Sequence, residues 1–268
     1  MALTEFVIMP GRDWQNICDN IREISGSTDL LTSGDVVEIM NPVLQMDAEL
    51  LNAGGAYPEN RPFVKTAVIP ENTAYLDVET FQTLPNVTEV HLNGNCDVEV
   101  YQEYDSSTKS YTYKNAFTIG NINLEHLVIK NRNALPQNFL AKSATLKSVE
   151  IEDCTGLVEN AFEGCSALTD VVFSGYVGAI PSYAFQLCTS LKNVTLCEGV
   201  TELAYYCFGT CMALESLTIP RTVTHIDSAA FYGHPNYGVP DVLLRVYSGS
   251  YAETWAIENG NRYEVIEE

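Results

Sequence analysis

AFEGCSALTDVVF, from Ala161, is followed 23 residues later by AFQLCTSLKNVTL, from Ala184, and then by CFGTCMALESLTI, from Cys207. Five phenylalanines keep this spacing: Phe139, Phe162, Phe185, Phe208 and Phe231. A fixed period of this length is the signature of a solenoid, in which each repeat forms one coil and packs against its neighbours. The repeat therefore decides the fold class.

Each period contains a short segment with apolar residues at its first, fourth and sixth positions, such as LTDVVF from Leu168. The alternation predicts a strand, with Val171 and Phe173 facing the interior and Asp170 facing the open side of a sheet. Equivalent segments begin at Val64, Val87, Leu124, Leu146, Leu191 and Leu214, and LLRVY from Leu243 ends the series. We therefore expect about eight rungs.

A second apolar set follows the strands and should close the far wall of the coil. It consists of Val177, Ile180, Val200, Leu203, Val223 and Ile226, and we expect the five phenylalanines to stack beside it as an aromatic spine. Cys165, Cys188 and Cys211 also step by 23 and should form a ladder. Parallel side chains do not readily reach disulfide geometry, so we expect buried free thiols. The sequence contains no CxxC pair and therefore does not indicate a zinc site.

The composition favours a folded domain and excludes some classes of partner. The chain has 268 residues, of which 46% are hydrophobic, and its 35 acidic and 14 basic side chains give a formal charge of −21. Such a charge opposes binding to nucleic acid or to anionic membranes, and it favours a cationic or neutral partner. Alternatively, the acidity only keeps an elongated protein soluble. We expect a monomer without membrane insertion.

The pattern AF-x-x-C-x-x-L-x-x-V-x-I/L-P-x-x-V-x-x-I resembles the leucine-rich repeats of the BspA-like type over about residues 62–255. VYSGSYAETWAIENG, from Val246, resembles the sequence that commonly ends such arrays. The resemblance implies a right-handed solenoid with a parallel sheet on its concave face and mostly irregular, short turns on its convex face. It also implies adhesion or protein binding and no catalysis. Lys142 and His234 depart from the pattern at the ladder position of Cys165.

Residues outside the repeats suggest two end segments. In residues 1–55, Trp14, Ile17, Ile21 and Ile24 recur at helical spacing and predict a small helical cap. ICDNIREISGSTDLLTSGDVVEIM, from Ile17, resembles a short module of prophage-encoded and tail-associated proteins. We assign residues 56–255 to the solenoid and 256–268 to a C-terminal tail or cap. The first residues carry no secretory signal. The cellular location is left open between the cytoplasm, a phage particle and, if a leader was removed, the cell surface.

The interval between Phe81 and Phe117 contains an insertion at about residues 94–115. Two runs rich in Val and Tyr flank a polar turn, which predicts a β-hairpin. Its tyrosines are Tyr101, Tyr104, Tyr111 and Tyr113. Tyrosine is enriched at binding hot spots, so the hairpin is a candidate contact site. The alternative is that it folds back and its tyrosines only cover a rung.

Outward positions of the rungs supply the other candidate ligand-binding residues, which are Glu89, His91, His126, Glu150 and Asp170. The two histidines come from adjacent rungs, so a metal site with Glu89 is conceivable, although such groups on an open sheet are usually just solvated. No motif of a hydrolase, metalloprotease or nucleotide-binding enzyme occurs. We therefore predict no enzyme, no metal and no cofactor.

Three functions are compatible with these features. The first is a non-catalytic protein-interaction or adhesion module that binds through the concave sheet and the tyrosine hairpin, with a host or cell-surface receptor as one kind of partner. The second is a structural or host-recognition protein of a phage or prophage. The third is a carbohydrate-binding protein that uses exposed aromatic and acidic side chains.

Overall fold

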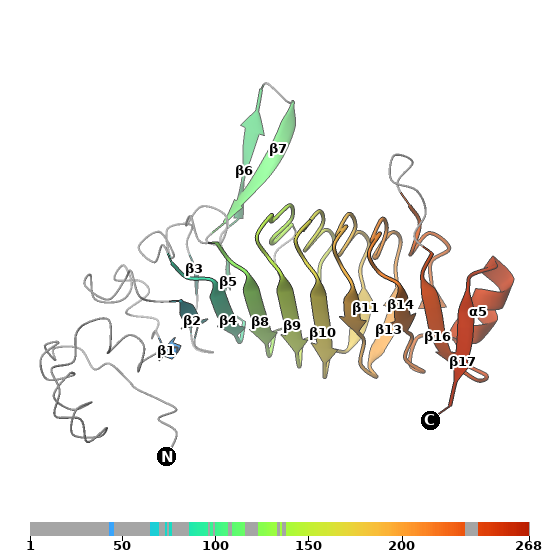
Figure 1. Ribbon diagram of the computed structural model, residues 1–268. Coiled ribbons are helices and arrows are strands. Elements are labelled where there is room, and N and C mark those ends of the chain that lie inside the picture. Colours follow the sequence, from blue (N-terminus) through green and yellow to red (C-terminus); the bar gives the residue numbers. More distant parts are fainter. Residues whose placement is uncertain are drawn as a thin grey trace, which may run out of the picture.

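The computed structural model describes residues 43–45, 65–69, 73, 75–76, 86–95, 97–98, 100–106, 109–115, 123–132, 135, 138–233 and 241–267. These residues form a solenoid of the leucine-rich-repeat type, in which one coil follows another along a single axis (Figure 1). The helices expected within residues 1–55 lie outside the described residues, as do Phe81 and Phe117.

The main sheet contains seven parallel strands in the order β1-β2-β4-β8-β9-β10-β12. They are β1 (Val43–Gln45), β2 (Thr66–Ile69), β4 (Glu89–Asn93), β8 (His126–Lys130), β9 (Ser148–Glu152), β10 (Asp170–Ser174) and β12 (Asn193–Thr195). A second parallel sheet contains β14 (Ser216–Thr218), β16 (Leu243–Tyr247) and β17 (Tyr263–Ile266). All eight predicted rung segments therefore form strands. β1 and β17 extend the array, and β1 lies inside the range assigned to the N-terminal cap.

The far wall of the coil contains two small parallel sheets where the sequence predicted mostly irregular turns. One pairs β3 (Tyr75–Leu76) with β5 (Asp97–Val98), and the other contains β11 (Gly178–Ile180), β13 (Val200–Leu203) and β15 (His225–Ile226). The apolar set of this wall is buried as expected, except for Val177, whose side chain is 55% exposed. Val200 pairs with Gly178 rather than with Val177, because the register shifts next to Gly178. The interior space at this level is filled by Tyr176, which is 1% exposed.

The predicted aromatic spine runs through the core. Phe185 stacks on Phe162 with ring centroids 5.4 Å apart and on Phe208 with centroids 5.6 Å apart. Phe208 stacks on Phe231 at 6.1 Å, whereas Phe139 meets Phe162 edge to face at 6.5 Å. All five rings are buried. Each coil thus covers the apolar edge that its neighbour cannot bury alone.

The cysteine ladder is buried and unoxidised. Cys165, Cys188 and Cys211 are 0% exposed, and each is a free thiol. The Sγ atoms donate to the carbonyl oxygens of Leu140, Phe162 and Phe185, respectively, in each case at 3.2 Å. The thiols therefore fill space, as predicted, and also hydrogen-bond to carbonyl groups one coil earlier.

Two elements complete the described structure. Strands β6 (Val100–Asp105) and β7 (Ser110–Asn115) form the predicted antiparallel hairpin, which projects away from the body (Figure 1). Helix α5 (Tyr251–Asn259) packs at the C-terminal end, where the sequence predicted a tail or cap from residue 256. Ser250 caps α5 by accepting a hydrogen bond from the Glu253 N–H, and Gly260 ends the helix in a left-handed conformation.

Candidate binding surface

The open face of the main sheet carries three rows of side chains that continue from strand to strand, and the last of them contains Asn93, Lys130, Glu152 and Ser174. The first row contains Thr66, Glu89, His126, Ser148, Asp170 and Asn193. The second row contains Val68, His91, Val128, Glu150, Val172 and Thr195. The structure thus brings all five non-aromatic residues of the predicted site onto one face, because strict register repeats the outward positions in every coil.

Glu89 and His91 form a local pair on β4. The Oε1 atom of Glu89 lies 2.6 Å from Nε2 of His91, and Oε2 accepts a hydrogen bond of 3.2 Å from the Thr66 hydroxyl. Both carboxylate oxygens therefore have a partner within the sheet. A ligand that binds here meets an acidic group that is already held in place.

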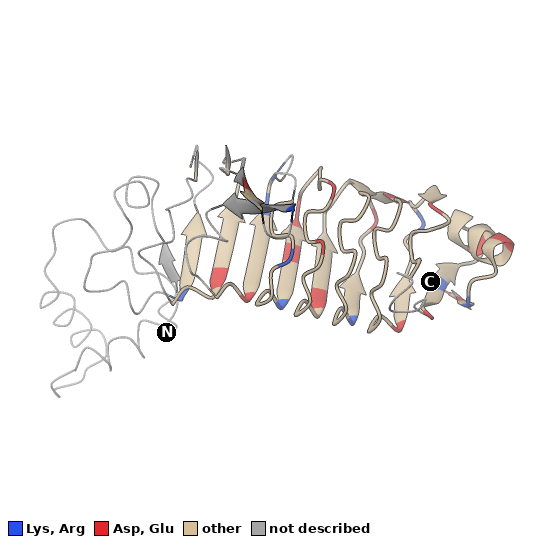
Figure 2. Ribbon diagram, turned by 90° about the horizontal axis from the view of Figure 1, so that it is seen from above, with Lys and Arg blue, Asp and Glu red and all other residues tan. Residues whose placement is uncertain are grey.

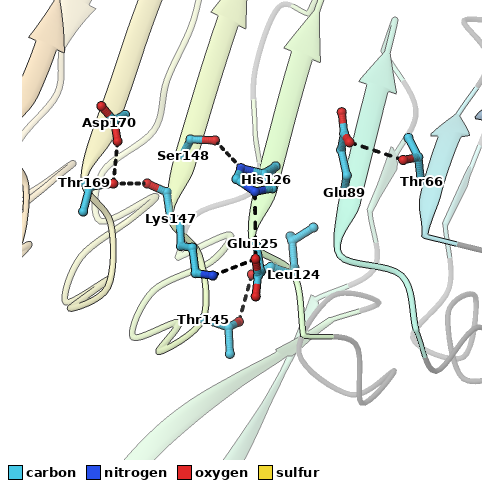
Figure 3. A network of polar contacts seen from close by, with 10 residues as sticks. All are labelled: Thr66, Glu89, Leu124, Glu125, His126, Thr145, Lys147, Ser148, Thr169 and Asp170. Carbon is cyan, nitrogen blue, oxygen red and sulfur yellow. Dashed lines mark hydrogen bonds and ion pairs between the residues drawn. The ribbon is translucent and has the colours of Figure 1, made fainter. Parts of the chain in front are cut away.

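His126 belongs to a different network at the beginning of β8 and β9 (Figure 3). Its Nδ1 lies 2.7 Å from the Ser148 hydroxyl, and its Nε2 lies 3.9 Å from Oε2 of Glu125. The same Oε2 lies 2.7 Å from Nζ of Lys147. Hydrogen bonding and the charge of Lys147 lower the pKa of the Glu125 carboxyl, with a smaller contribution from His126 and against a partial desolvation that raises it.

The two histidines thus have separate partners. Within the described part of the chain, no group of three or more His, Cys, Asp or Glu side chains is arranged to hold a metal ion. His91, His126 and Glu89 therefore do not come together as one metal site.

Asp170 and Glu150 are the acidic groups in the middle of the open face. Asp170 accepts hydrogen bonds from the Thr169 hydroxyl and, at 2.7 Å, from the side-chain amide of Asn193. Glu150 is exposed, and its carboxylate has no polar partner among the described residues. Glu150 is therefore the carboxylate of this face most available to a ligand.

Opposite charges follow one another along the edge of the sheet at which the strands begin (Figure 2). Backbone hydrogen bonds connect Glu125 to Lys147, Lys147 to Thr169 and Thr169 to Lys192, so these residues occupy equivalent places in successive coils. The edge is therefore mixed in charge, whereas the second row behind it carries the acid Glu150 and no Lys or Arg within the main sheet.

The hairpin leaves the solenoid at this same edge, near the start of β8 (Figure 1). Its register pairs Tyr104 with Tyr111 and Gln102 with Tyr113, which places these four positions on one face of the ribbon and Tyr101 on the other. Tyr104 is 53% exposed. The side chains of Tyr101, Tyr111 and Tyr113 lie outside the described part.

A buried cation that the sequence analysis missed lies where β4 and β8 end. Arg132 is 4% exposed, and its Nη1 donates to the Gly94 carbonyl at 3.0 Å. The Gly94 N–H in turn donates to the Lys130 carbonyl at 2.9 Å. The contact therefore joins the residues that follow β4 to those that follow β8. An arginine shortly after the predicted strand was the available sequence signal.

A second group of tyrosines, which the sequence analysis also missed, lies in the turns that follow β11, β13 and β15. We call Tyr183, Tyr205, Tyr206 and Tyr232 the tyrosine strip. Tyr206 lies at its centre, with ring centroids 4.5 Å from Tyr205, 5.9 Å from Tyr232 and 6.0 Å from Tyr183. Tyr183 and Tyr206 are 23 residues apart, so the period of the repeat contained the signal.

Comparison with known families agrees with the architecture. Residues 106–237 match the family model described as BspA type leucine rich repeat region, in six copies. This match confirms the expected resemblance for the central coils, within the wider range of residues 62–255 over which we predicted it. No curated protein matches the chain.

Three of the solved structures with a similar course of the chain are bacterial leucine-rich repeat proteins. One from Bacteroides ovatus is 14% identical to this chain. The match covers 80% of this chain and 59% of the chain from B. ovatus, with a TM-score of 0.39. One from Eubacterium ventriosum is 19% identical and covers 63% and 58%, with a TM-score of 0.36. A leucine rich cell surface protein from Faecalibacterium prausnitzii is 21% identical and covers 82% and 67%, with a TM-score of 0.43.

This chain spans less than two thirds of the length of the first two of these proteins. The segment expected to resemble a tail-associated module, residues 17–40, lies outside the described residues, and the family model does not reach it. Among the residues described, no helix is long and apolar enough to span a bilayer.

Proposed function

We propose that this solenoid is a non-catalytic module that binds a protein partner through the open face of the main sheet together with the β6–β7 hairpin. The observation that carries the proposal is the position of the hairpin, which stands at the edge where β8, β9 and β10 begin, next to the open face that carries Glu150 on β9 and Asp170 on β10. A flat, register-locked sheet and an aromatic projection next to it form two sides of one surface.

The sheet is suited to recognition because its backbone is determined by the core. Val149 and Val171 are 0% exposed and hold β9 and β10 in place, so Glu150 and Asp170 are presented from a rigid support. A rigid support lowers the entropic cost of binding. The exposed ring of Tyr104 adds a large contact area with few rotatable bonds.

Charge supports a partner with a basic contact surface. The chain has a formal charge of −21, and Glu150 has no internal partner among the described residues. Complementary charge raises the rate of association and is screened by salt. We therefore infer that binding weakens as ionic strength rises.

The test uses two matched pairs of variants in the full-length chain. Partners retained from an extract of cell surfaces are identified by mass spectrometry, and the purified partner is then titrated calorimetrically. Glu150→Lys is compared with Glu258→Lys, which makes the same charge change at an exposed position of α5. Tyr104→Ala is compared with Tyr251→Ala, which removes a 39%-exposed ring from α5.

The proposal predicts that Glu150→Lys and Tyr104→Ala each weaken binding by about tenfold or more, which corresponds to the loss of one hot-spot contact. The two α5 variants should change the affinity by less than about threefold, because they lie outside the proposed surface. Equal effects of Glu150→Lys and Glu258→Lys would reduce the interaction to general charge attraction and would contradict a defined site.

The phage hypothesis stays a prediction. A structural role in a phage particle would give a chain that assembles with itself or with tail components and retains no cell-surface protein. Analytical ultracentrifugation of the full chain separates these cases, because the protein-binding proposal expects a monomer. The absence of catalysis is likewise part of the proposal, and it is supported by the lack of hydrolase, metalloprotease and nucleotide-binding motifs in the sequence.

A further inference from the structure

A cavity of about 340 Å³ lies between the last coil and α5. Its apolar lining is aromatic, with Phe231, Tyr232 and Trp255, and the rings of Phe231 and Trp255 lie 6.4 Å apart at 60° to each other. The volume falls in the range of about 300–1,000 Å³ that is typical of small-ligand sites. The cavity forms at the C-terminal end of the array, because its lining residues come from the last coil, from α5 and from the residues that precede β17.

The polar lining of the cavity is balanced in charge. Arg262 donates from Nη1 to Oδ2 of Asp241 at 3.3 Å, so the guanidinium and the carboxylate compensate each other. Asn259 donates its side-chain amide to the Trp255 carbonyl at 2.9 Å, which leaves Oδ1 without a partner among the described residues. Asn261 lines the cavity beside it. These groups provide several hydrogen-bond donors and acceptors but little net charge.

This lining matches a sugar ring better than a charged or purely apolar ligand. A pyranose has an apolar face of C–H groups that can lie against the negative face of an aromatic ring, and a rim of hydroxyl groups that donate and accept hydrogen bonds. An anionic ligand would face Asp241, and a cation would face Arg262. A neutral ligand avoids both repulsions.

Aromatic surface continues outward from the cavity. Tyr232, which is 52% exposed, lines the cavity and also contacts Tyr206 in the tyrosine strip at 5.9 Å between ring centroids. Tyr205 is 43% exposed, and its ring centroid lies 4.5 Å from that of Tyr206. The strip therefore continues from the cavity toward the preceding coil, where Tyr205 is exposed.

We propose that the cavity beside α5 and the adjoining tyrosine strip form a binding site for a neutral oligosaccharide. One sugar unit occupies the cavity against Tyr232 and the edges of Phe231 and Trp255, with Asn259 and Asn261 as hydrogen-bond partners. Further units lie along the strip. The site is independent of the proposed protein-binding surface, so either can fail without the other.

The position of Trp255 provides the measurement. The chain has two tryptophans, and Trp14→Phe leaves Trp255 as the single indole reporter in the full-length protein. This protein is titrated with neutral oligosaccharides of four to six units, each composed of glucose, mannose, galactose or N-acetylglucosamine. We expect at least one of them to change the emission of Trp255 in a saturable manner below about 10 mM, since isolated small-ligand sites reach dissociation constants near 1 mM or tighter.

Variants connect the signal to the site. Tyr232→Ala and Asn261→Ala should each weaken the interaction by about tenfold or more, whereas Tyr104→Ala on the hairpin should leave the affinity within about twofold. Circular dichroism and the thermal unfolding midpoint verify that each variant is folded. Asn261→Ala retains the backbone hydrogen bond from Asn261 to the Ala256 carbonyl, so the end of α5 is preserved.

Three outcomes would overturn the inference. No oligosaccharide gives a saturable signal, or the signal survives both site variants unchanged, or a proline-rich peptide saturates the site while no sugar does. The last outcome would assign the aromatic strip to peptide recognition, because aromatic-lined grooves also bind polyproline helices.

Discussion

Replacing Phe185 by alanine should destabilise the solenoid more than any other single ring truncation in the middle of the spine. Phe185 is 0% exposed and touches three rings, with Phe162 and Phe208 stacked above and below it and Phe173 edge to face at 6.1 Å. Truncation of a buried phenylalanine costs about 3–5 kcal/mol in transfer and cavity free energy. Each lost ring pair adds about 0.5–1.5 kcal/mol to the cost of the buried area. We therefore expect the loss in the free energy of unfolding to lie near the upper end of the range, at about 5 kcal/mol.

The assay is urea unfolding of the full-length chain, followed in parallel by far-UV circular dichroism and by the fluorescence of Trp255 in a Trp14→Phe background. Coils of a solenoid are coupled only to their neighbours, so a cavity at Phe185 should separate the transition of the C-terminal coils from that of the whole array. Tyr263→Ala, which removes a 39%-exposed ring, serves as the control and should change the free energy of unfolding by less than about 0.5 kcal/mol. A loss below about 1.5 kcal/mol for Phe185→Ala, with both transitions coincident, would refute the spine as the main source of coupling.

Three further predictions follow from individual groups. Burial raises the pKa of the Cys188 and Cys207 thiols, so iodoacetamide at pH 8 should modify them far more slowly in the native protein than in urea; equal rates by mass spectrometry would contradict their burial. The lowered pKa of Glu125 stabilises the fold above the pKa of the unfolded chain, and this contribution is lost as pH falls through the lower folded value. In a carbon-13 NMR titration, Lys147→Met should therefore raise the Glu125 midpoint, and an unchanged midpoint would exclude the pair as the cause. Gly199→Ala should cost at least about 2 kcal/mol in urea unfolding, because φ is +124° and the added Cβ would lie 2.3 Å from the Tyr176 carbonyl oxygen; a neutral substitution would show that the turn can rearrange.

Most of the fold could be predicted because the same core positions recur in every coil. Phe162, Phe185 and Phe208 keep one spacing in the sequence and one stacking geometry in space. A solenoid places residues one period apart directly on top of each other, so sequence period and spatial neighbour coincide. In a globular fold, contacts between distant residues break this relation.

The exception at Val177 shows where the period loses its predictive power. Simple spacing aligns Val177 with Val200, but the structure pairs Val200 with Gly178. Tyr176 occupies the interior and donates its hydroxyl to the Ala179 carbonyl at 2.6 Å. A buried tyrosine needs a partner for its hydroxyl, and meeting this need shifted the local register by one residue.

The candidate sites could be predicted only in part. Outward residues such as Glu150 and Asp170 were identified because strand alternation places them on the open face. Their partners were not predicted, since hydrogen bonds such as that from Asn193 to Asp170 depend on side-chain rotamers rather than on period. The cavity beside α5 was missed altogether, because it joins residues of the last coil with residues of a helix that does not repeat.

The cysteine ladder and the open face explain why the repeat reveals architecture more readily than function. At the ladder position, Cys188 must be small enough to be buried and must donate to the Phe162 carbonyl, so few residue types fit. On the first row, Ser148 and Asp170 occupy the same place in adjacent coils with different chemistry, because solvent tolerates both. Ligand preference therefore depends on those positions that folding leaves free, together with features that interrupt the period, namely the β6–β7 hairpin and the end formed by α5. Binding experiments on this solenoid should accordingly begin at its interruptions, whose exposed residues are not determined by the period of the core.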